Sequence, residues 1–165
     1  MPKIRIEPDA YINKTLNFSQ VDVDKYVKSC LHDACELIRD YARVHHEYED
    51  NPARQAREGH KGLTRAIKYR VLRRAKSEYG FVGEVYIDEK IAPYGRYQLY
   101  GTKDHGPVVA PALRFFSDRF GSWFSLKQVS GIKADNFLQK ALDDNRLEVT
   151  EIFRRRWEEM MNGKL

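Results

Sequence analysis

Hydrophobic residues recur with helical spacing over residues 23–42. Every third or fourth position is apolar, with polar residues between, and the apolar set is Val23, Tyr26, Val27, Cys30, Leu31, Ala34, Leu37, Ile38, Tyr41 and Ala42. This spacing collects the apolar side chains along one side of an α-helix. We therefore predict one long amphipathic helix, with Ser19 or Asp22 as its N-cap, that buries this side against a sheet or a second helix.

Alternating apolar and polar residues predict strands on either side of this helix. Residues 1–20 contain a short alternating run between two prolines, and we expect them to form an edge strand or an ordered arm. Residues 67–71 and 81–88 alternate in the same way and are separated by a turn near 77–80. This arrangement predicts a β-hairpin.

The last third of the chain predicts a second hairpin and a long helix. Residues 113–116 and 123–126 are apolar runs on either side of a glycine-containing turn, which indicates two more antiparallel strands. Helical spacing then returns, and the predicted helix runs from Asp135 or Asn136 to about Met161.

These elements follow the order strand, helix, hairpin, loop, hairpin and helix, which is typical of the α+β class. We predict a single domain over residues 1–165, in which a small antiparallel sheet built from hairpins packs against the long N-terminal helix and the long C-terminal helix. Residues 45–62 and 102–111 show no periodicity and contain glycine and proline, so we expect them to be mobile loops.

Positive charge is unevenly placed along the chain. The formal net charge is +5, with a pI near 9.1. Between residues 54 and 76, nine basic residues accompany a single acid, Glu58. A basic face of this kind attracts the acidic surface of a neighbour or the phosphates of a nucleic acid. The residues that we assign to this face are Arg65, Lys68, Arg70, Arg73, Arg74 and Lys76.

His45, His46 and Glu47 are the most obvious candidates for a metal site. Adjacent histidines on a helix point apart, whereas two metal ligands need the same face, so this cluster is more typical of a solvated helix end. Cys30 and Cys35 fit no common zinc spacing and are expected to be buried thiols. We predict no catalytic residue, cofactor or metal; a metal-dependent hydrolase around the histidines is the less favoured alternative.

The segment from Tyr94 to Thr102 has the composition of a contact surface. Tyr94, Tyr97 and Tyr100 stand beside Arg96, and tyrosine and arginine are enriched among the residues that dominate binding energy at protein interfaces. We therefore predict that this segment contacts a partner rather than forming part of the core.

Four short motifs occur in a definite order along the chain. They are a helix ending in alanine and a basic residue, a glycine–leucine pair before a strand, a tyrosine-rich segment closing on glycine–threonine, and a phenylalanine–leucine pair that starts a helix: Tyr41-Ala42-Arg43; Gly62-Leu63 with Ile67; Tyr94, Tyr97, Gly101 and Thr102; Ala134, Phe137, Leu138 and Ala141. In this order they resemble the tail-completion, or head-to-tail joining, neck proteins of tailed bacteriophages. Leu99, Tyr100 and Asn136 depart from the family pattern.

The resemblance implies a structural virion protein without enzymatic activity, assembled in the host cytoplasm and located at the head-proximal end of the tail. Its expected partners are further copies of itself in a closed ring of roughly six or twelve subunits, the head connector or stopper, and the tail terminator or tail tube, with DNA in the channel and no membrane. A basic nucleic-acid-binding module is the alternative function. The expected interface residues are Tyr94, Arg96, Tyr97, Tyr100, Gly101, Thr102, His105 and Phe137.

Overall fold

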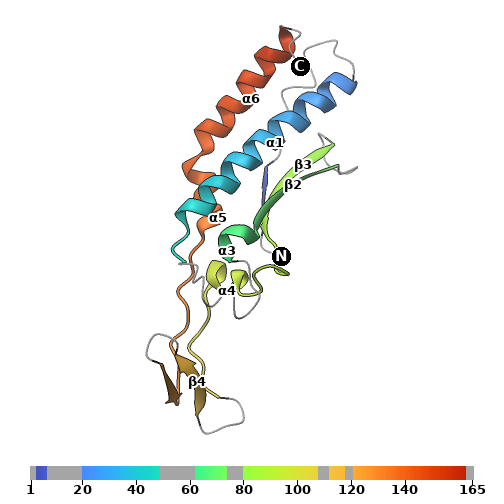
Figure 1. Cartoon of the computed structure of the whole chain (residues 1–165). Coiled ribbons are helices and arrows are strands. Elements are labelled where there is room, and N and C mark those ends of the chain that lie inside the picture. Colours follow the sequence, from blue (N-terminus) through green and yellow to red (C-terminus); the bar gives the residue numbers. More distant parts are fainter. Residues whose placement is uncertain are drawn as a thin grey trace.

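The computed structural model describes residues 3–6, 20–48, 62–73, 80–107, 112–117 and 121–162. These residues form an α+β fold with a long helix near each end of the chain, as predicted (Figure 1). The elements in chain order are β1 (Lys3–Ile6), α1 (Gln20–His45), α3 (Leu63–Ala66), β2 (Ile67–Arg73), β3 (Phe81–Ile87), α4 (Gly95–Tyr100), β4 (Leu113–Ser117), β5 (Ser122–Leu126), α5 (Phe137–Asp144) and α6 (Arg146–Met161).

Strands β1, β3 and β2 form one antiparallel sheet in that spatial order. The predicted hairpin is confirmed as β2 and β3, although its turn at residues 74–79 lies outside the described residues. The predicted N-terminal edge strand is confirmed as β1, and residues 7–19 again lie outside the description. Because side chains alternate along a strand, Val85 and Ile87 enter the core while Glu84 and Tyr86 point to the opposite face, the outer sheet face.

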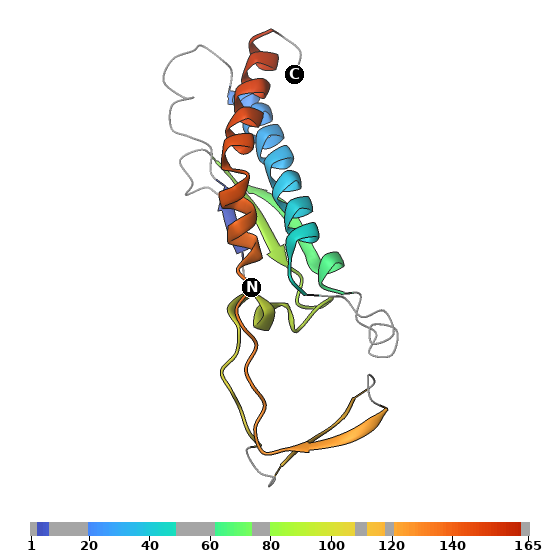
Figure 2. The same ribbon diagram turned by 90° about the vertical axis from the view of Figure 1, so that its left-hand side faces the viewer.

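Helices α1 and α5 pack on the inner face of this sheet, and α6 packs against α1. Helix α1 runs antiparallel to α5 and α6, and both views place the three helices on the same side of the strands (Figures 1 and 2). The Tyr26 hydroxyl donates a hydrogen bond of 2.9 Å to the Phe153 carbonyl and so ties α1 to α6. Among the described residues, no helix covers the outer sheet face.

Close packing of α1 on the sheet depends on one glycine. A Cβ atom on Gly83 of β3 would lie 2.5 Å from the Cys35 sulfur, so only glycine allows the helix this near. Cys30 and Cys35 are fully buried, and burial raises the pKa of each thiol to about 12. The prediction of buried cysteines is confirmed, and both stay protonated near neutral pH.

The C-terminal helix was predicted as one continuous element, and this prediction was wrong. It is interrupted at Asn145, whose backbone (φ −104°, ψ 14°) is not helical. The side-chain amide of the buried Asn145 donates a hydrogen bond of 2.8 Å to the Ala141 carbonyl. In a continuous helix, this carbonyl would accept the backbone N–H of Asn145 instead. Two aspartates precede this residue, and this run of poor helix formers ends α5 before α6 begins.

The described residues between 101 and 135 leave the body of the molecule as a projecting arm. Its stem consists of residues 101–107 running beside 127–135, and its tip is the predicted second hairpin, confirmed as β4 and β5 (Figures 1 and 2). The backbones of His105 and Val129 exchange both of their hydrogen bonds across the stem. Residues 102–107 of the predicted loop therefore form part of this stem, while 108–111, like 49–61 of the other predicted loop, lie outside the described residues.

Candidate interface on the arm and the outer sheet face

The arm begins where two glycines let the chain cross itself closely. Gly101 ends α4 with a φ of +70°, a backbone region that favours glycine, and a Cβ there would lie 2.6 Å from the Ile132 carbonyl oxygen. A Cβ on Gly131 would clash with the Thr102 carbonyl oxygen. Thr102 stabilises this crossing with two hydrogen bonds to Ile132. Its backbone N–H donates a hydrogen bond of 2.8 Å to the Ile132 carbonyl, and its hydroxyl accepts a hydrogen bond from the Ile132 N–H.

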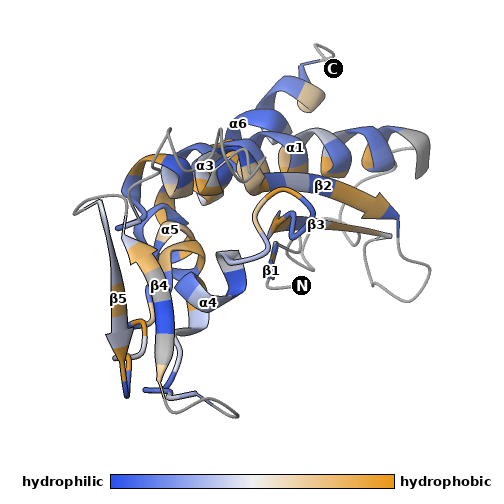
Figure 3. Cartoon of the chain, turned by 60° about the horizontal axis from the view of Figure 1, so that its bottom comes forward, coloured by the Kyte–Doolittle hydropathy of each residue, from blue (hydrophilic) through white to orange (hydrophobic). Residues whose placement is uncertain are grey.

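The hairpin at the tip presents large apolar side chains to solvent. Phe116 and Trp123 pair across the strands on one face, with ring centroids 5.7 Å apart, and are 44% and 74% exposed. Leu126, on the opposite face, is 40% exposed. Hydrophobic segments occur on both strands (Figure 3). A two-stranded hairpin is marginally stable alone in water, so apolar residues on both of its faces indicate a surface that a partner covers.

The three predicted tyrosines, Tyr94 at the N-cap of α4 and Tyr97 and Tyr100 within it, have different surroundings. Tyr94 packs on the core beside Tyr48, with ring centroids 5.2 Å apart. Tyr97 and Tyr100 are exposed at the base of the arm, and the Arg96 guanidinium lies 4.7 Å from the Tyr97 ring centroid and donates to its hydroxyl. The exposed part of the tyrosine segment is therefore Arg96, Tyr97 and Tyr100.

Phe137 does not belong to the predicted interface. It is 1% exposed in the core, where it makes an edge contact with the His46 ring, because it is the first apolar residue of α5 and faces α1. Gly101 and Thr102 shape the base of the arm, as described above. His105 is exposed on the stem, with its ring Nδ1 3.4 Å from the Lys103 carbonyl.

Four cations lie on the outer sheet face, and three of them contact one buried carboxylate. Strand pairing sets Lys3 and Lys68 on either side of Tyr86, and Arg5 and Arg70 on either side of Glu84. The Glu84 side chain is 0% exposed. Its carboxylate oxygens lie 3.2 Å from the Lys3 ammonium, 3.4 Å from the Arg5 guanidinium and 2.8 Å from the Arg70 guanidinium. Lys68 pairs with Asp88 at 2.8 Å. Each of the four cations remains partly exposed.

These contacts control the ionisation of Glu84. Burial alone raises the pKa of this carboxyl, but the hydrogen bonds from Arg70 and Lys3, together with their charges, outweigh burial and leave the pKa below its ordinary value. Glu84 is therefore ionised at neutral pH, and it fixes the three cations above the central strand.

Replacing Glu84 by glutamine tests this arrangement. We expect Glu84→Gln to lower the free energy of unfolding at neutral pH by roughly 2 kcal/mol, because the bonds to a charged acceptor are lost. The pKa of Glu84 is lower in the folded protein than in the unfolded chain. The stabilisation from the ionised carboxylate is therefore complete above the unfolded-state pKa and is lost as the pH falls toward the folded-state pKa. Urea unfolding at a series of pH values measures the difference.

Glu151→Gln is the matched control, because Glu151 also has a lowered pKa but lies exposed on α6, paired with Arg154. An exposed pair contributes little, so we expect a change near zero at every pH. A Glu84→Gln difference that stays constant down to pH 3 would contradict the assignment.

The predicted basic face is only partly one surface. Lys68 and Arg70 share the outer sheet face, but Arg73 points to the helical side, where it lies 3.7 Å from Asp24. Arg65 is on α3, and Arg74 and Lys76 lie outside the described residues. The alternation of side chains along β2 explains the split, because Arg73 lies an odd number of residues from Lys68 and Arg70.

The histidine cluster at the end of α1 does not converge. His45 stacks on Tyr41 and its Nδ1 lies 2.9 Å from the Tyr41 carbonyl, while the His46 Nε2 lies 3.0 Å from the Thr64 hydroxyl. The backbone N–H of Glu47 donates to Asp135. Within the described ranges, no three His, Cys, Asp or Glu side chains are grouped as metal ligands.

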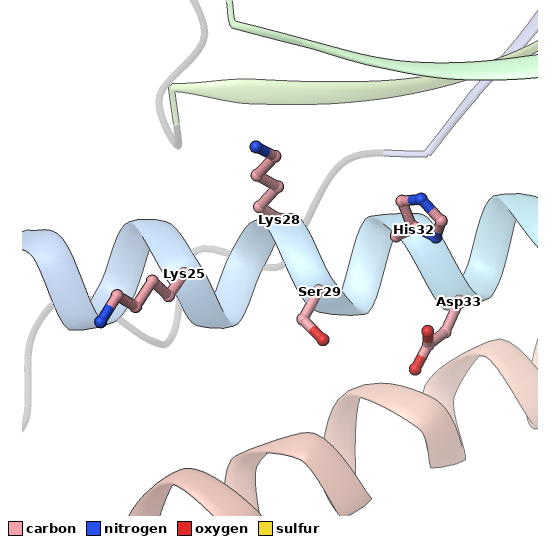
Figure 4. A pocket seen from close by; sticks show the side chains of 5 residues that line it. All are labelled: Lys25, Lys28, Ser29, His32 and Asp33. Atoms are coloured by element: carbon pink, nitrogen blue, oxygen red, sulfur yellow. The ribbon is translucent and has the colours of Figure 1, made fainter. Parts of the chain in front are cut away.

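A shallow hollow of about 350 Å³ lies along α1 and carries no convergent chemistry. Its side chains diverge, since Lys28 and His32 point toward the sheet and Asp33 points toward α6 (Figure 4). Asp33 is bound by Arg156 at 2.7 Å, and His32 contacts the Tyr69 hydroxyl at 3.1 Å. None of the helices in the described part of the chain has the length and apolarity needed to cross a membrane.

Comparison with known proteins does not assign a family. No protein-family model matches the chain, and neither curated proteins nor solved structures show significant similarity to it.

The sequence reading missed two parts of this candidate interface. The exposure of Phe116 and Trp123 had a signal in the sequence. In both strands of this hairpin, apolar residues occupy odd and even positions alike, so both faces of the hairpin are apolar and one buried face cannot account for them. The signal for Glu84 was an isolated acid inside an otherwise apolar strand. Assigning Lys3 and Arg5 to it requires the pairing of β1 with β3.

Proposed function

We propose that this chain is a structural subunit of a tailed-phage virion, one that forms a ring at the head-proximal end of the tail and joins the tail to the neck. It acts by docking, with no reaction to catalyse. The projecting arm is the single observation that carries the proposal, and the motif resemblance supplies its biological setting.

The arm has the properties of an assembly element. Its hairpin lies away from the helices and sheet, so the apolar surface of Phe116, Trp123 and Leu126 is not covered by the described body of the same chain. A second copy of the chain covers this apolar surface in the proposed assembly. An arm that docks on a different surface of its neighbour makes a heterologous contact, and such contacts repeated around an axis close into a ring.

The exposed surface of α4 extends this contact to the root of the arm. Tyr97 and Tyr100 lie beside the Gly101 turn from which the arm emerges, and Ile132 of the opposite stem strand is also exposed. We assign the tip and this root to one docking surface, defined by Arg96, Tyr97, Tyr100, Phe116, Trp123, Leu126 and Ile132.

The tip is tested by replacing its most exposed aromatic residue. We expect Trp123→Ser to leave the unfolding free energy of the monomer within about 0.5 kcal/mol of the parent, because the side chain is 74% exposed. Assembly should weaken at least tenfold, since a tryptophan buried at an interface contributes about 2 kcal/mol or more. Light scattering and native mass spectrometry across concentration measure the distribution of oligomers.

Leu147→Ser is the matched control, because Leu147 is 84% exposed but lies on α6, outside the proposed docking surface. It should assemble like the parent. If the parent chain is a monomer at all concentrations and also fails to form a ring with isolated head or tail particles, the proposed function is wrong.

A further inference from the structure

The cations of the outer sheet face form a regular array. Lys3 and Arg5 are two residues apart on β1, and Lys68 and Arg70 are two residues apart on β2, in matching register across β3. Strand geometry places the members of each pair about 7 Å apart and the two pairs about 10 Å apart. These are backbone spacings: the charged groups of Lys3, Arg5 and Arg70 converge on Glu84, and the Lys68 ammonium pairs with Asp88.

This array keeps unused hydrogen-bond donors. Two guanidinium groups and one ammonium group carry more N–H donors than the two Glu84 oxygens can accept. Glu84 is itself buried beneath them, so solvent meets the cations and not the carboxylate. The result is a set of preoriented donors with a positive outward field, which matches a polyanion.

The aromatic residue within the array does not offer a free stacking surface. The Arg70 guanidinium lies 4.9 Å from the centroid of the Tyr86 ring and covers it. A base would have to displace this contact in order to stack on that face of the ring, and the exposed cations are the groups that bind phosphates.

Charge is also divided between the two layers of the body. On the outer face, strands β1, β2 and β3 carry four basic residues and one acidic residue, Glu84, while Arg73 of β2 faces the helices. Asp88, directly after β3, pairs with Lys68. Helices α1, α5 and α6 carry nine basic and eleven acidic residues. A polyanion is therefore directed to the sheet side of the molecule and away from the helical side.

From this arrangement we infer that the outer sheet face binds the phosphate backbone of duplex nucleic acid, without sequence preference, through Lys3, Arg5, Lys68 and Arg70. The inference goes beyond the structural role proposed above and does not depend on ring formation. In a ring around a DNA channel, binding through this face would orient the sheet toward the duplex and the helices away from the duplex.

Fluorescence anisotropy with a labelled random-sequence DNA duplex tests the inference on the full chain. Contacts to four phosphates predict binding about 150-fold weaker at 200 mM salt than at 50 mM. The double variant Lys3→Gln, Lys68→Gln removes two of these contacts but keeps both arginines on Glu84. For this variant, the loss of affinity between 50 mM and 200 mM salt should fall to about 12-fold, and binding should be weaker at every salt concentration.

Arg154→Gln, Arg155→Gln is the control, because it removes the same charge from the exposed helical side. It should bind like the parent, and circular dichroism should show that both double variants are folded. Absence of binding at 50 mM salt, or equal weakening by the two double variants, would overturn the inference. Preference for one duplex sequence would also contradict it.

Discussion

Removal of the arm at its base is expected to abolish self-assembly and to leave the body folded. The variant replaces residues 103–130 with a short glycine-serine turn. Thr102 and Ile132 are already joined by hydrogen bonds of 2.8 and 2.9 Å across the stem, so a tight turn can connect the two strands without moving them.

The body should survive because the described residues of the arm contribute nothing to its core. All of the buried hydrophobic residues in the described part of the chain lie at or before Leu99, or at or after Phe137. Far-ultraviolet circular dichroism and urea unfolding should therefore show a folded protein with an unfolding free energy within about 1 kcal/mol of the parent monomer.

Mixing the shortened chain with the full-length chain sharpens this test. In a heterologous contact, the shortened chain still presents the surface that receives a neighbour's arm but cannot donate an arm itself. It should end growing assemblies, so that native mass spectrometry detects short open oligomers containing one shortened subunit. Rings of unchanged size formed by the shortened chain alone would show that the arm is not the ring contact.

The body was predictable from the sequence because its signals are long or local. Helix α1 repeats its apolar spacing over many turns, and the β2–β3 hairpin joins two alternating runs through a short connection. The break at Asn145 was missed because the apolar spacing continues across it, with Ala141 and Leu142 before it and Val149 after it. Only the buried hydrogen bond to Ala141 reveals why α5 ends there.

The candidate interface was less predictable, since it depends on contacts between distant parts of the chain. Alternation identifies β4 and β5 as strands but does not say whether another layer covers them. The array around Glu84 combines Arg5 and Arg70, which meet only through the pairing of β1 and β2 with β3. Tyr94 and Tyr97 have the same residue type and similar neighbours in sequence, but Tyr94, the N-cap of α4, packs on the core and Tyr97, within α4, is exposed.

Phe137→Ala is expected to destabilise the monomer by about 3–5 kcal/mol, the cost of deleting a buried aromatic ring and leaving a cavity. The ring is 1% exposed and packs among the buried side chains contributed by α1 and its neighbours, including an edge contact with His46 at 5.8 Å. Urea unfolding of the monomeric protein at low concentration measures this change, which approaches the total stability of a marginal domain.

Phe116→Ala is the matched control, because it makes the same substitution at a phenylalanine that is 44% exposed on the arm. The two variants should separate two properties: Phe137→Ala lowers monomer stability, whereas Phe116→Ala keeps it within about 0.5 kcal/mol and weakens assembly. A Phe137→Ala variant with full monomer stability and defective assembly would restore this residue to the interface. Because the chemical change is identical, a difference between the variants must come from where the fold places each ring.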